Sequence, residues 1–451
     1  MQISKQLFTI GALLFVQAFG HAQTKETRYL SLQEVWEIAR ARNYEIELAE
    51  IAIEQAKGKD LESLSGFFPN ISISENYLKS NDPVTVFALK LKQGAFTQQD
   101  FALPALNQPA AQDNFTTLVQ IKQPLFNLDA RYGKSAAGWN VKAKRASAKR
   151  ARETIFLHVS KAYYGLILAR EKFSAIKKAQ RSAQLHRNNA KAIFEQGMIN
   201  KADYLAAEVR LAELKEQQII ARNQIDNAGD ALKFLVGLGE ENEIMPTDSL
   251  GAPVSSASQS NQAATTASRS DLRAMKAGAR AANNNQAMQY SSWAPRLNAF
   301  GAVEWNASQA FQKDADNWMF GLQLEWNLFE GFGKWGRAKQ ASAQKQSAEL
   351  QYRHAVEKAK MEIRIAGRAI HSTQERIIAA QYAVDQADES LRIIEERFNQ
   401  GLEKTSDLLD KEVALTHARL RHLQAKFDFN VALIELDYTK GAMDIQMEKR
   451  K

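Results

Sequence analysis

Polar and apolar positions along the chain follow two different periods. Four long tracts, 129–196, 202–236, 336–400 and 406–438, are rich in Ala, Glu, Lys, Arg, Gln and Leu, which favour helices. All eight prolines lie outside these tracts. Because proline inside a helix removes a hydrogen bond and clashes with the preceding turn, this spacing predicts four long helices. The first would be roughly 100 Å long.

The last of these tracts carries apolar residues at heptad spacing. One stripe holds Val413, Leu420, Phe427 and Ile434, and a second, partly polar stripe holds Leu409, Thr416, Leu423 and Asn430. Two such stripes predict coiled-coil packing of this helix.

Four shorter stretches, 70–77, 115–122, 297–305 and 318–327, alternate with a period of two. In the last, Phe320 and Leu322 fall on one face and Gln323 on the other. This alternation is typical of β-strands. A length of about nine or ten residues matches a tilted strand crossing a bilayer. Trp305 and Trp326, near the ends of two stretches, suit an interfacial aromatic girdle.

The chain repeats itself. "FEQGMINKADYL" (194–205) and "FNQGLEKTSDLL" (398–409) share five residue types in register, with Gly197 and Gly401 in the middle. Each half reads as helix, two strands, long helix, glycine break and helix, which indicates internal repetition. The predicted layout is a first repeat at 23–246, a Ser/Ala/Gln-rich linker at 247–268, a second repeat at 269–441 and a basic tail at 442–451. Residues 79–113, which have no counterpart in the second half, are expected to form a long surface loop.

The first 22 residues have the pattern of a secretory signal. Lys5 precedes an apolar run, and Gly20 and Ala22 suit cleavage before Gln23. An uncleaved anchor is the alternative. No later segment is long and apolar enough for a transmembrane helix. An exported chain of this kind is periplasmic, secreted or an outer-membrane barrel.

Composition excludes several classes of site. The chain has no cysteine, which excludes disulfides, thiolate metal sites and lipidated cysteine. Its net charge of +8 is spread along helices among Asp and Glu, which favours solvated faces over nucleic-acid binding. The histidines after the signal show no metal-binding spacing; they are His158, His186, His354, His371, His417 and His422.

The stretch "GFGKWG" (331–336) has the spacing of a dinucleotide-binding loop. The preceding strand alternates, however, whereas a strand in a parallel sheet is apolar on both faces. The stretch is therefore interpreted as a strand-to-helix bend. With no nucleophile motif and no catalytic dyad, an enzyme and a bound cofactor are not expected.

Four amphipathic strands cannot close a barrel, and open edges in lipid are prohibitively costly. Two copies would supply eight strands, which leave room only for side chains, whereas three would supply twelve and a pore. A homotrimer is therefore favoured. The alternatives are a soluble sheet packed on helices and a periplasmic coiled-coil scaffold without a pore.

Several motifs together resemble the outer membrane efflux protein family, the TolC-like channels. They are "QPLFN" (123–127), "WNLFEGFGKWGRAK" (326–339), the two glycine breaks and the helix ending "DNAGDALKFLVG" (226–237). "NDPVTVFALKLKQGAF" (81–96) is similar to a loop in a subset of members. The resemblance implies an α+β membrane protein with four transmembrane strands per chain in a twelve-stranded trimeric barrel, continued by a long antiparallel α-helical coiled-coil tunnel in the periplasm.

The same resemblance implies a function and partners. The barrel would lie in outer-membrane lipid, and the tunnel would dock on an inner-membrane pump and a periplasmic adaptor protein. It would pass small molecules or proteins out of the cell, as in multidrug efflux or type I secretion. No nucleic acid partner is expected.

The glycine breaks become hairpin tips in this interpretation. Gly197 and Gly401 can adopt the positive φ of a helix-ending turn. Met198, Ile199 and Leu402 would contact the adaptor, the alternative being exposure to solvent without a partner.

A candidate gate lies beside the second tip. Asp407 and Asp410 are three residues apart on one helix face, and three chains would gather six carboxylates that attract cations. Asp407 could instead serve only the helix start. The first hairpin has Asp203 at the matching position but Ala206 where Asp410 stands. Phe398 and Glu403 occupy positions where family members carry the tyrosine and arginine of a clamp, which argues against an arginine clamp here.

Overall fold

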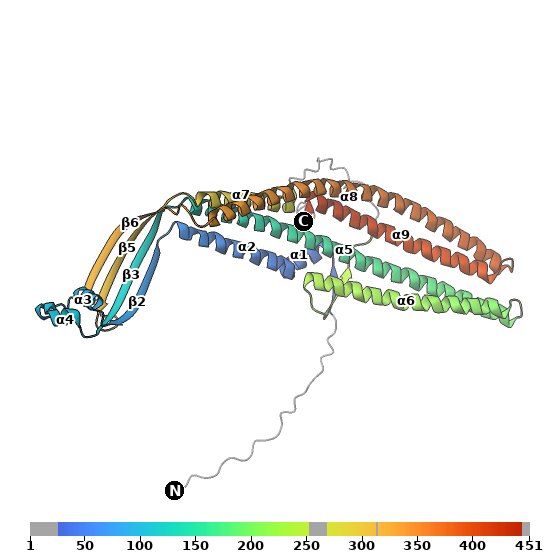
Figure 1. Ribbon diagram of the computed structural model, residues 1–451. Helices are drawn as coiled ribbons and strands as arrows, with labels where there is room; N and C mark the ends of the chain where they lie inside the picture. Colours follow the sequence, from blue (N-terminus) through green and yellow to red (C-terminus); the bar gives the residue numbers. More distant parts are fainter. Residues whose placement is uncertain (1–25, 252–267, 313, 444–451) are drawn as a thin grey trace, which may run out of the picture.

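The computed structural model describes residues 26–251, 268–312 and 314–443. They form an elongated molecule with a β-sheet at one end and two long helical hairpins reaching toward the other (Figure 1). The expected signal 1–22, residues 252–267 of the expected linker and residues 444–451 of the expected tail lie outside the described residues.

The helices follow the predicted tracts closely. The four long helices end within three residues of the predicted limits, so this prediction is confirmed. The α-helices are α1 (Leu32–Arg42), α2 (Tyr44–Glu62), α3 (Pro83–Lys92), α4 (Leu103–Asn107), α5 (Leu128–Glu195), α6 (Lys201–Val236), α7 (Ser270–Ser291), α8 (Gly333–Asn399) and α9 (Thr405–Lys440), with 3-10 turns η1 (Ser63–Gly66) and η2 (Gln98–Phe101).

Short and long helices meet end to end, which lengthens the rods seen in Figure 1. Asn43, the N-cap of α2, donates its Nδ2 hydrogen to the carbonyl of Leu235 at the end of α6, at 2.8 Å. Ser268, just before α7, donates its Oγ hydrogen to the carbonyl of Lys440 at the end of α9, at 2.7 Å. These bonds satisfy carbonyls that a helix end leaves unpaired.

The predicted strands form one antiparallel sheet in the order β2-β3-β5-β6. Their bounds are β2 (Asn70–Ser80), β3 (Gln112–Phe126), β5 (Arg296–Ala307) and β6 (Ala315–Glu325). Within the described chain, β2 and β6 each pair on one side only. The four-stranded prediction is confirmed.

The sheet has one apolar and one largely polar face. One cross-strand row runs Ile73, Val119, Val303, Trp318. The next row, on the opposite face, runs Ser74, Leu118, Glu304, Asn317. The apolar face is exposed in the single chain, with large exposed residues Ile71, Ile73, Trp318, Phe320, Leu322 and Leu324. A face of this kind requires an apolar surrounding.

A second, smaller sheet lies halfway along the molecule. β1 (Glu26–Leu30) pairs in parallel with β4 (Asn242–Pro246), across more than 200 residues of chain. The main core packs beside it, where Trp36 donates to Ser160 Oγ at 2.9 Å and Tyr163 donates to the carbonyl of Leu30 at 2.8 Å. This junction fixes α1 against α5 and was not anticipated.

Two expectations need correction. The segment 79–113 is not an extended loop: it contains α3, η2 and α4. The deepest burial on α9 is not on the two predicted stripes but at Leu408, Leu415, Ala418, Ala425, Phe429 and Ala432, while the predicted residues are mostly half-buried. Ala425 and Phe429 of α9 pack with Ile377 of α8, so the seam between the two helices combines small and large residues.

Candidate gate and docking surface at the hairpin tips

The two glycine breaks form the same turn. Gly197 and Gly401 have φ of 75° and 76°, in the left-handed region that favours glycine. The amide of Gly197 donates to the carbonyl of Phe194 at 2.8 Å, and that of Gly401 to the carbonyl of Phe398 at 2.9 Å. Both tips lie at the end of the molecule opposite the sheet (Figure 1).

The residues after the two glycines are apolar and exposed. Met198 is 73% exposed and Leu402 is 63% exposed, while Ile199 is half-buried. Exposed apolar side chains at a tip suit a partner surface.

The candidate gate carboxylates occupy the starts of two helices. Asp407 lies in the first turn of α9 and is half-buried, while Asp410 follows in the next turn and is exposed. Asp203 lies in the first turn of α6, whose N-cap Asn200 accepts from its amide at 2.9 Å. Within the described chain, no hydrogen bond joins Asp203 to Asp407 or Asp410. The Asp407–Asp410 pair therefore lies apart from Asp203, in the first two turns of α9.

Aromatic and charged contacts brace each tip. In the first hairpin the rings of Phe194 and Tyr204 stack, with centroids 5.7 Å apart. In the second, Phe398 is 6% exposed. Arg397 Nε lies 2.8 Å from Glu403 Oε1, so an arginine contact is present, but within the hairpin itself.

The hairpins are tied to one another by a partly buried histidine that the sequence did not single out. His186 on α5 places Nε2 3.1 Å from Glu412 Oε1 on α9 and 3.9 Å from Glu395 Oε1 on α8. Glu412 is 6% exposed and neither of its oxygens accepts an aligned hydrogen bond. Burial alone would lower the pKa of His186, but the contact with Glu412 and the charges of both glutamates raise it above its ordinary 6.5.

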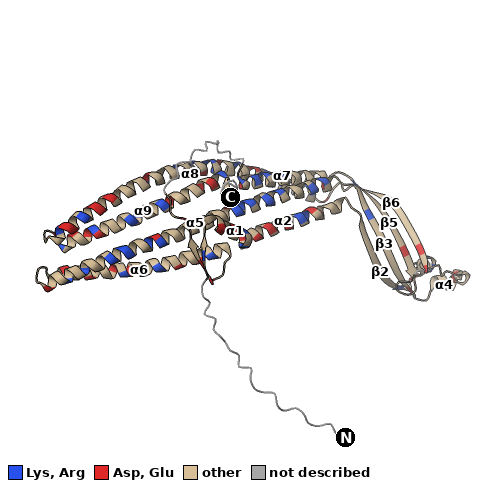
Figure 2. Cartoon of the chain, turned by 180° about the vertical axis from the view of Figure 1, so that it is seen from behind, with Lys and Arg blue, Asp and Glu red and all other residues tan. Residues whose placement is uncertain are grey.

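Elsewhere on the described part of the chain, charged side chains are spread along the helices. Basic and acidic residues alternate along the helices (Figure 2), as solvated faces do. No group of three His, Cys, Asp or Glu within the described ranges could hold a metal ion. In those ranges no helix combines the length and apolarity needed to cross a membrane.

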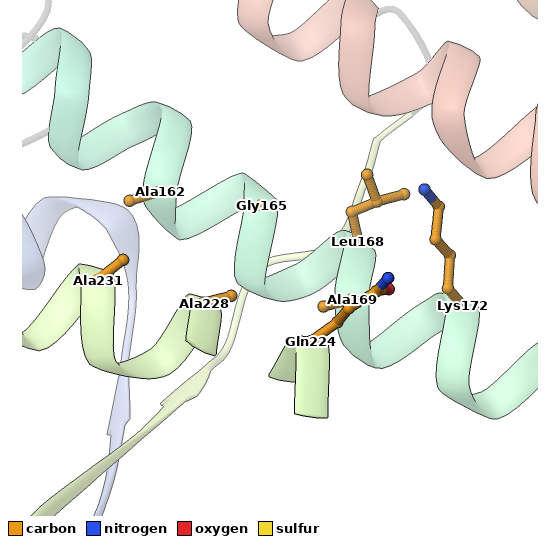
Figure 3. A pocket seen from close by; sticks show the side chains of 8 residues that line it. All are labelled: Ala162, Gly165, Leu168, Ala169, Lys172, Gln224, Ala228 and Ala231. Atoms are coloured by element: carbon orange, nitrogen blue, oxygen red, sulfur yellow. The ribbon is translucent and has the colours of Figure 1, made fainter. Parts of the chain in front are cut away.

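A shallow groove between α5 and α6 also lacks reactive groups (Figure 3). Lys172 at its rim donates to Gln424 Oε1 on α9 at 2.9 Å, so its ammonium group is already bound. The lining is Ala162, Gly165, Leu168, Ala169, Lys172, Gln224, Ala228 and Ala231.

A family model described as "Outer membrane efflux protein" matches residues 35–238 and 263–442. The chain belongs to this family. Among curated relatives, the alkaline protease secretion protein AprF of Pseudomonas aeruginosa is 23% identical, covering 74% of this chain and 70% of the relative. Outer membrane protein TolC of Vibrio cholerae is 21% identical, covering 84% and 92%.

Solved structures share the fold of this outer membrane efflux protein. The Campylobacter jejuni CmeC outer membrane channel superposes with a TM-score of 0.77 at 17% identity, covering 98% of this chain and 94% of that one. VceC of Vibrio cholerae gives 0.76 at 19% identity, covering 91% and 96%. The predicted family and fold are confirmed. As a family member the chain is a channel of the outer membrane with a periplasmic part, and not an enzyme.

The "GFGKWG" stretch takes its place in this fold as a junction. Gly331 and Phe332 have φ of 53° and 65°, and α8 begins at Gly333. Two successive left-handed residues turn the chain from the region after β6 into the long helix, which is the predicted strand-to-helix bend.

Proposed function

We propose that the protein is the outer-membrane exit duct of a multi-component export system. One observation carries this proposal: a two-faced sheet with unpaired edges continues, in the same chain, into the helices α5 and α8, each roughly 100 Å long. The apolar face suits lipid and the polar face suits water. The helices are long enough to extend far into the periplasm.

A homotrimer follows from the strand count. Three copies would pool twelve strands, pair the free edges of β2 and β6, and enclose water. Apolar residues along the helices also need covering in a single chain; large exposed ones are Leu48, Ile219, Phe234, Ile378 and Tyr382. Neighbouring copies would bury them.

Partners and chain layout complete the proposal. The exposed Met198 and Leu402 would meet an adaptor protein linked to an inner-membrane pump. Asp407 and Asp410, together with Asp203 of the first hairpin and the buried Phe398 of the second, would form the periplasmic gate. The proposed layout is a cleaved signal 1–22, repeats at 23–246 and 269–441, a linker at 247–268 and a tail at 442–451.

The cargo is a small toxic molecule or a protein. AprF is named for the secretion of alkaline protease, which supports a protein as the cargo. Deletion of the gene, followed by susceptibility profiling with antibiotics and toxins and by comparison of secreted proteins, would separate the two.

Fractionation and electrophysiology test the duct itself. We expect heat-resistant trimers in the outer-membrane fraction and conductance in planar bilayers. Soluble monomers would instead support a periplasmic coiled-coil scaffold, and turnover of a defined substrate would end the transport proposal.

A further inference from the structure

The segment 81–111, here named the cap, joins β2 to β3 at the end of the sheet away from the helices (Figures 1 and 2). Asp82 caps α3 by accepting from the amide of Thr85 at 2.8 Å. Lys90 Nζ lies 2.6 Å from Asp100 Oδ1, which ties α3 to η2. The cap therefore has a defined structure of its own.

A small apolar core supports the cap. The ring of Phe96 makes edge contacts with Phe87 and Phe101, at centroid distances of 4.8 and 5.0 Å. Val86 and Leu89 are buried at 2% and 7% exposure. A segment with this much packing moves as a unit rather than as a loose loop.

Polar contacts fasten the cap to the sheet. Lys92 Nζ lies 2.8 Å from Glu304 Oε1 on β5. Gln93 donates to Asn114 Oδ1 on β3 at 2.7 Å, and Asn114 in turn donates to Asn306 Oδ1 on β5 at 2.9 Å. Gln93, Asn114 and Asn306 are all buried, so the network is shielded from water.

All of these sheet residues lie on the polar face. Asn306 pairs with Thr116, and Glu304 lies two residues away on the same side of β5, opposite to Val303. A Cβ at Gly94 would lie 3.9 Å from the Cβ of Ala315, which pairs with Asn306 and shares that face. In a closed barrel the polar face surrounds the water-filled interior, so the cap lies inside the rim rather than on the lipid side.

We propose that the cap restricts the outer mouth of the channel and is held over it by the Lys92–Glu304 pair and the Gln93–Asn114–Asn306 network. This proposal rests on the proposed duct function. The cap would set the size of solute that passes, and release of the latch would widen the exit.

The dimensions support a restriction. Twelve strands about 4.8 Å apart and tilted by about 40° enclose a ring of roughly 24 Å between backbones. Three helices, each about 10 Å across with side chains, fill a ring of about 22 Å. Three copies of α3 inside the rim would thus leave little open cross-section. Exposed apolar residues of the cap would meet the other copies near the axis; they are Val84, Leu91, Phe101 and Leu103.

A cysteine probe inside the barrel tests the restriction independently of the periplasmic gate. The chain has no cysteine, so Gln120→Cys would be a unique target. Gln120 lies on the polar face and pairs with Ala302, closer to the helices than Glu304. The probe is a maleimide on polyethylene glycol, too bulky to cross the outer membrane elsewhere, added to intact cells.

Adding Lys92→Ala to the Gln120→Cys variant is expected to raise the labelling rate about five-fold. This is the change in the closed-to-open equilibrium that loss of one partly buried ion pair would cause. Lys79→Ala is the matched control, because Lys79 pairs with Asp113 at 3.2 Å at the same end of the sheet and not with the cap. This control should label as slowly as the parent. Heat-resistant trimers would show that each variant assembles.

Equal labelling of the parent and Lys92→Ala, in channels that assemble and conduct, would overturn the cap proposal and leave the duct intact. Absence of trimers and conductance in the parent would overturn both. The double variant Gly94→Cys with Ala315→Cys should form a disulfide on oxidation, since the two Cβ positions have disulfide spacing. Failure to form it in assembled trimers would contradict the placement of the cap on the polar face.

Discussion

At the scale of single residues, His186 shows how one imidazole can join two hairpins. Its neighbour Glu412 is buried without an aligned hydrogen-bond donor, so the cost of its burial is offset mainly by the nearby imidazole. Glu395 adds a second negative charge from α8. Protonated His186 thus links α5 to both helices of the second hairpin.

This link predicts a pH-dependent stability. Because the folded-state pKa of His186 is raised above 6.5, its stabilisation is complete below about pH 6.5 and is lost as the pH rises through the raised value. The Tm of the trimer in detergent should therefore fall more between about pH 6 and about pH 9 for the parent than for His186→Gln. The exposed His354 on α8 gives the control His354→Gln, which should retain the parent's pH dependence. Identical pH profiles for the parent and His186→Gln would refute the link.

The gate carboxylates give a second prediction at this scale. Replacing Asp407 and Asp410 together by Ala removes two charges per chain at the tip where three chains would converge in the proposed trimer. We expect conductance to rise and block by divalent cations to weaken roughly ten-fold, because each cation loses attraction at short range. Asp226→Ala, an exposed carboxylate further along α6, is the control in planar bilayers. Unchanged conductance and block in the double variant would remove the gate assignment but leave the duct.

At the scale of elements, the ends of helices are as important as their length. Gly237 ends α6 with φ of 69°, and a Cβ there would lie 2.7 Å from the carbonyl oxygen of Arg42. Gly441 ends α9 with φ of 68° against Arg269, at the same separation of 204 positions as the two tips. The repeat thus extends to the joints where helices meet end to end.

Gly237→Ala should therefore destabilise the protein. A non-glycine residue at this φ, together with the backbone contact, is expected to cost roughly 1–3 kcal/mol in free energy of unfolding. Gly229→Ala in the same helix has no atom within 4 Å of the new methyl, and should stabilise by up to about 1 kcal/mol. Chemical denaturation measures the free energy of unfolding of both variants and of the parent. A destabilisation of equal size in both would mean that the joint has no special requirement.

The sequence predicted these elements unequally, for physical reasons. Periodicity and proline spacing are local signals, so the long helices were found to within three residues and the four strands to within four. Two other contacts join residues more than 200 positions apart: the pairing of β1 with β4 and the contact of His186 with Glu412. The local spacing of residue types cannot predict contacts at such separations. At the tips the repeat predicted the glycine turns, but whether Asp407 and Asp410 gate the channel depends on other copies of the chain.

The predictions for the cap and for the α9 seam were wrong for a different reason. The cap has no counterpart in the second half, and its fold depends on pairs such as Lys92–Glu304 that form only once the sheet exists. On α9 the prediction considered only two stripes of mostly large residues, whereas the buried positions combine small residues such as Ala418 and Ala425 with large ones such as Phe429. Half-buried Leu423 and Phe427 pack instead against the main core on α5 and α6.

At the scale of the whole molecule, the two faces of the sheet decide between a duct and a soluble scaffold. Phe320 lies on the apolar face of β6 and is 72% exposed in the single chain, while Gln323 is exposed on the polar face of the same strand. In a membrane barrel the first would face lipid and the second water. In a soluble scaffold both would face water.

Arginine at each position separates the two cases. Phe320→Arg places a charge in lipid in every copy, at about 2–4 kcal/mol each near the middle of the bilayer, so the yield of heat-resistant trimers in the outer-membrane fraction should collapse. Gln323→Arg keeps its charge in water and should assemble at the parent's yield. The contrast tests which face meets lipid, because both positions lie on β6 and receive the same substituent. Equal yields for both variants would mean that the apolar face does not meet lipid, and the barrel would have to be abandoned.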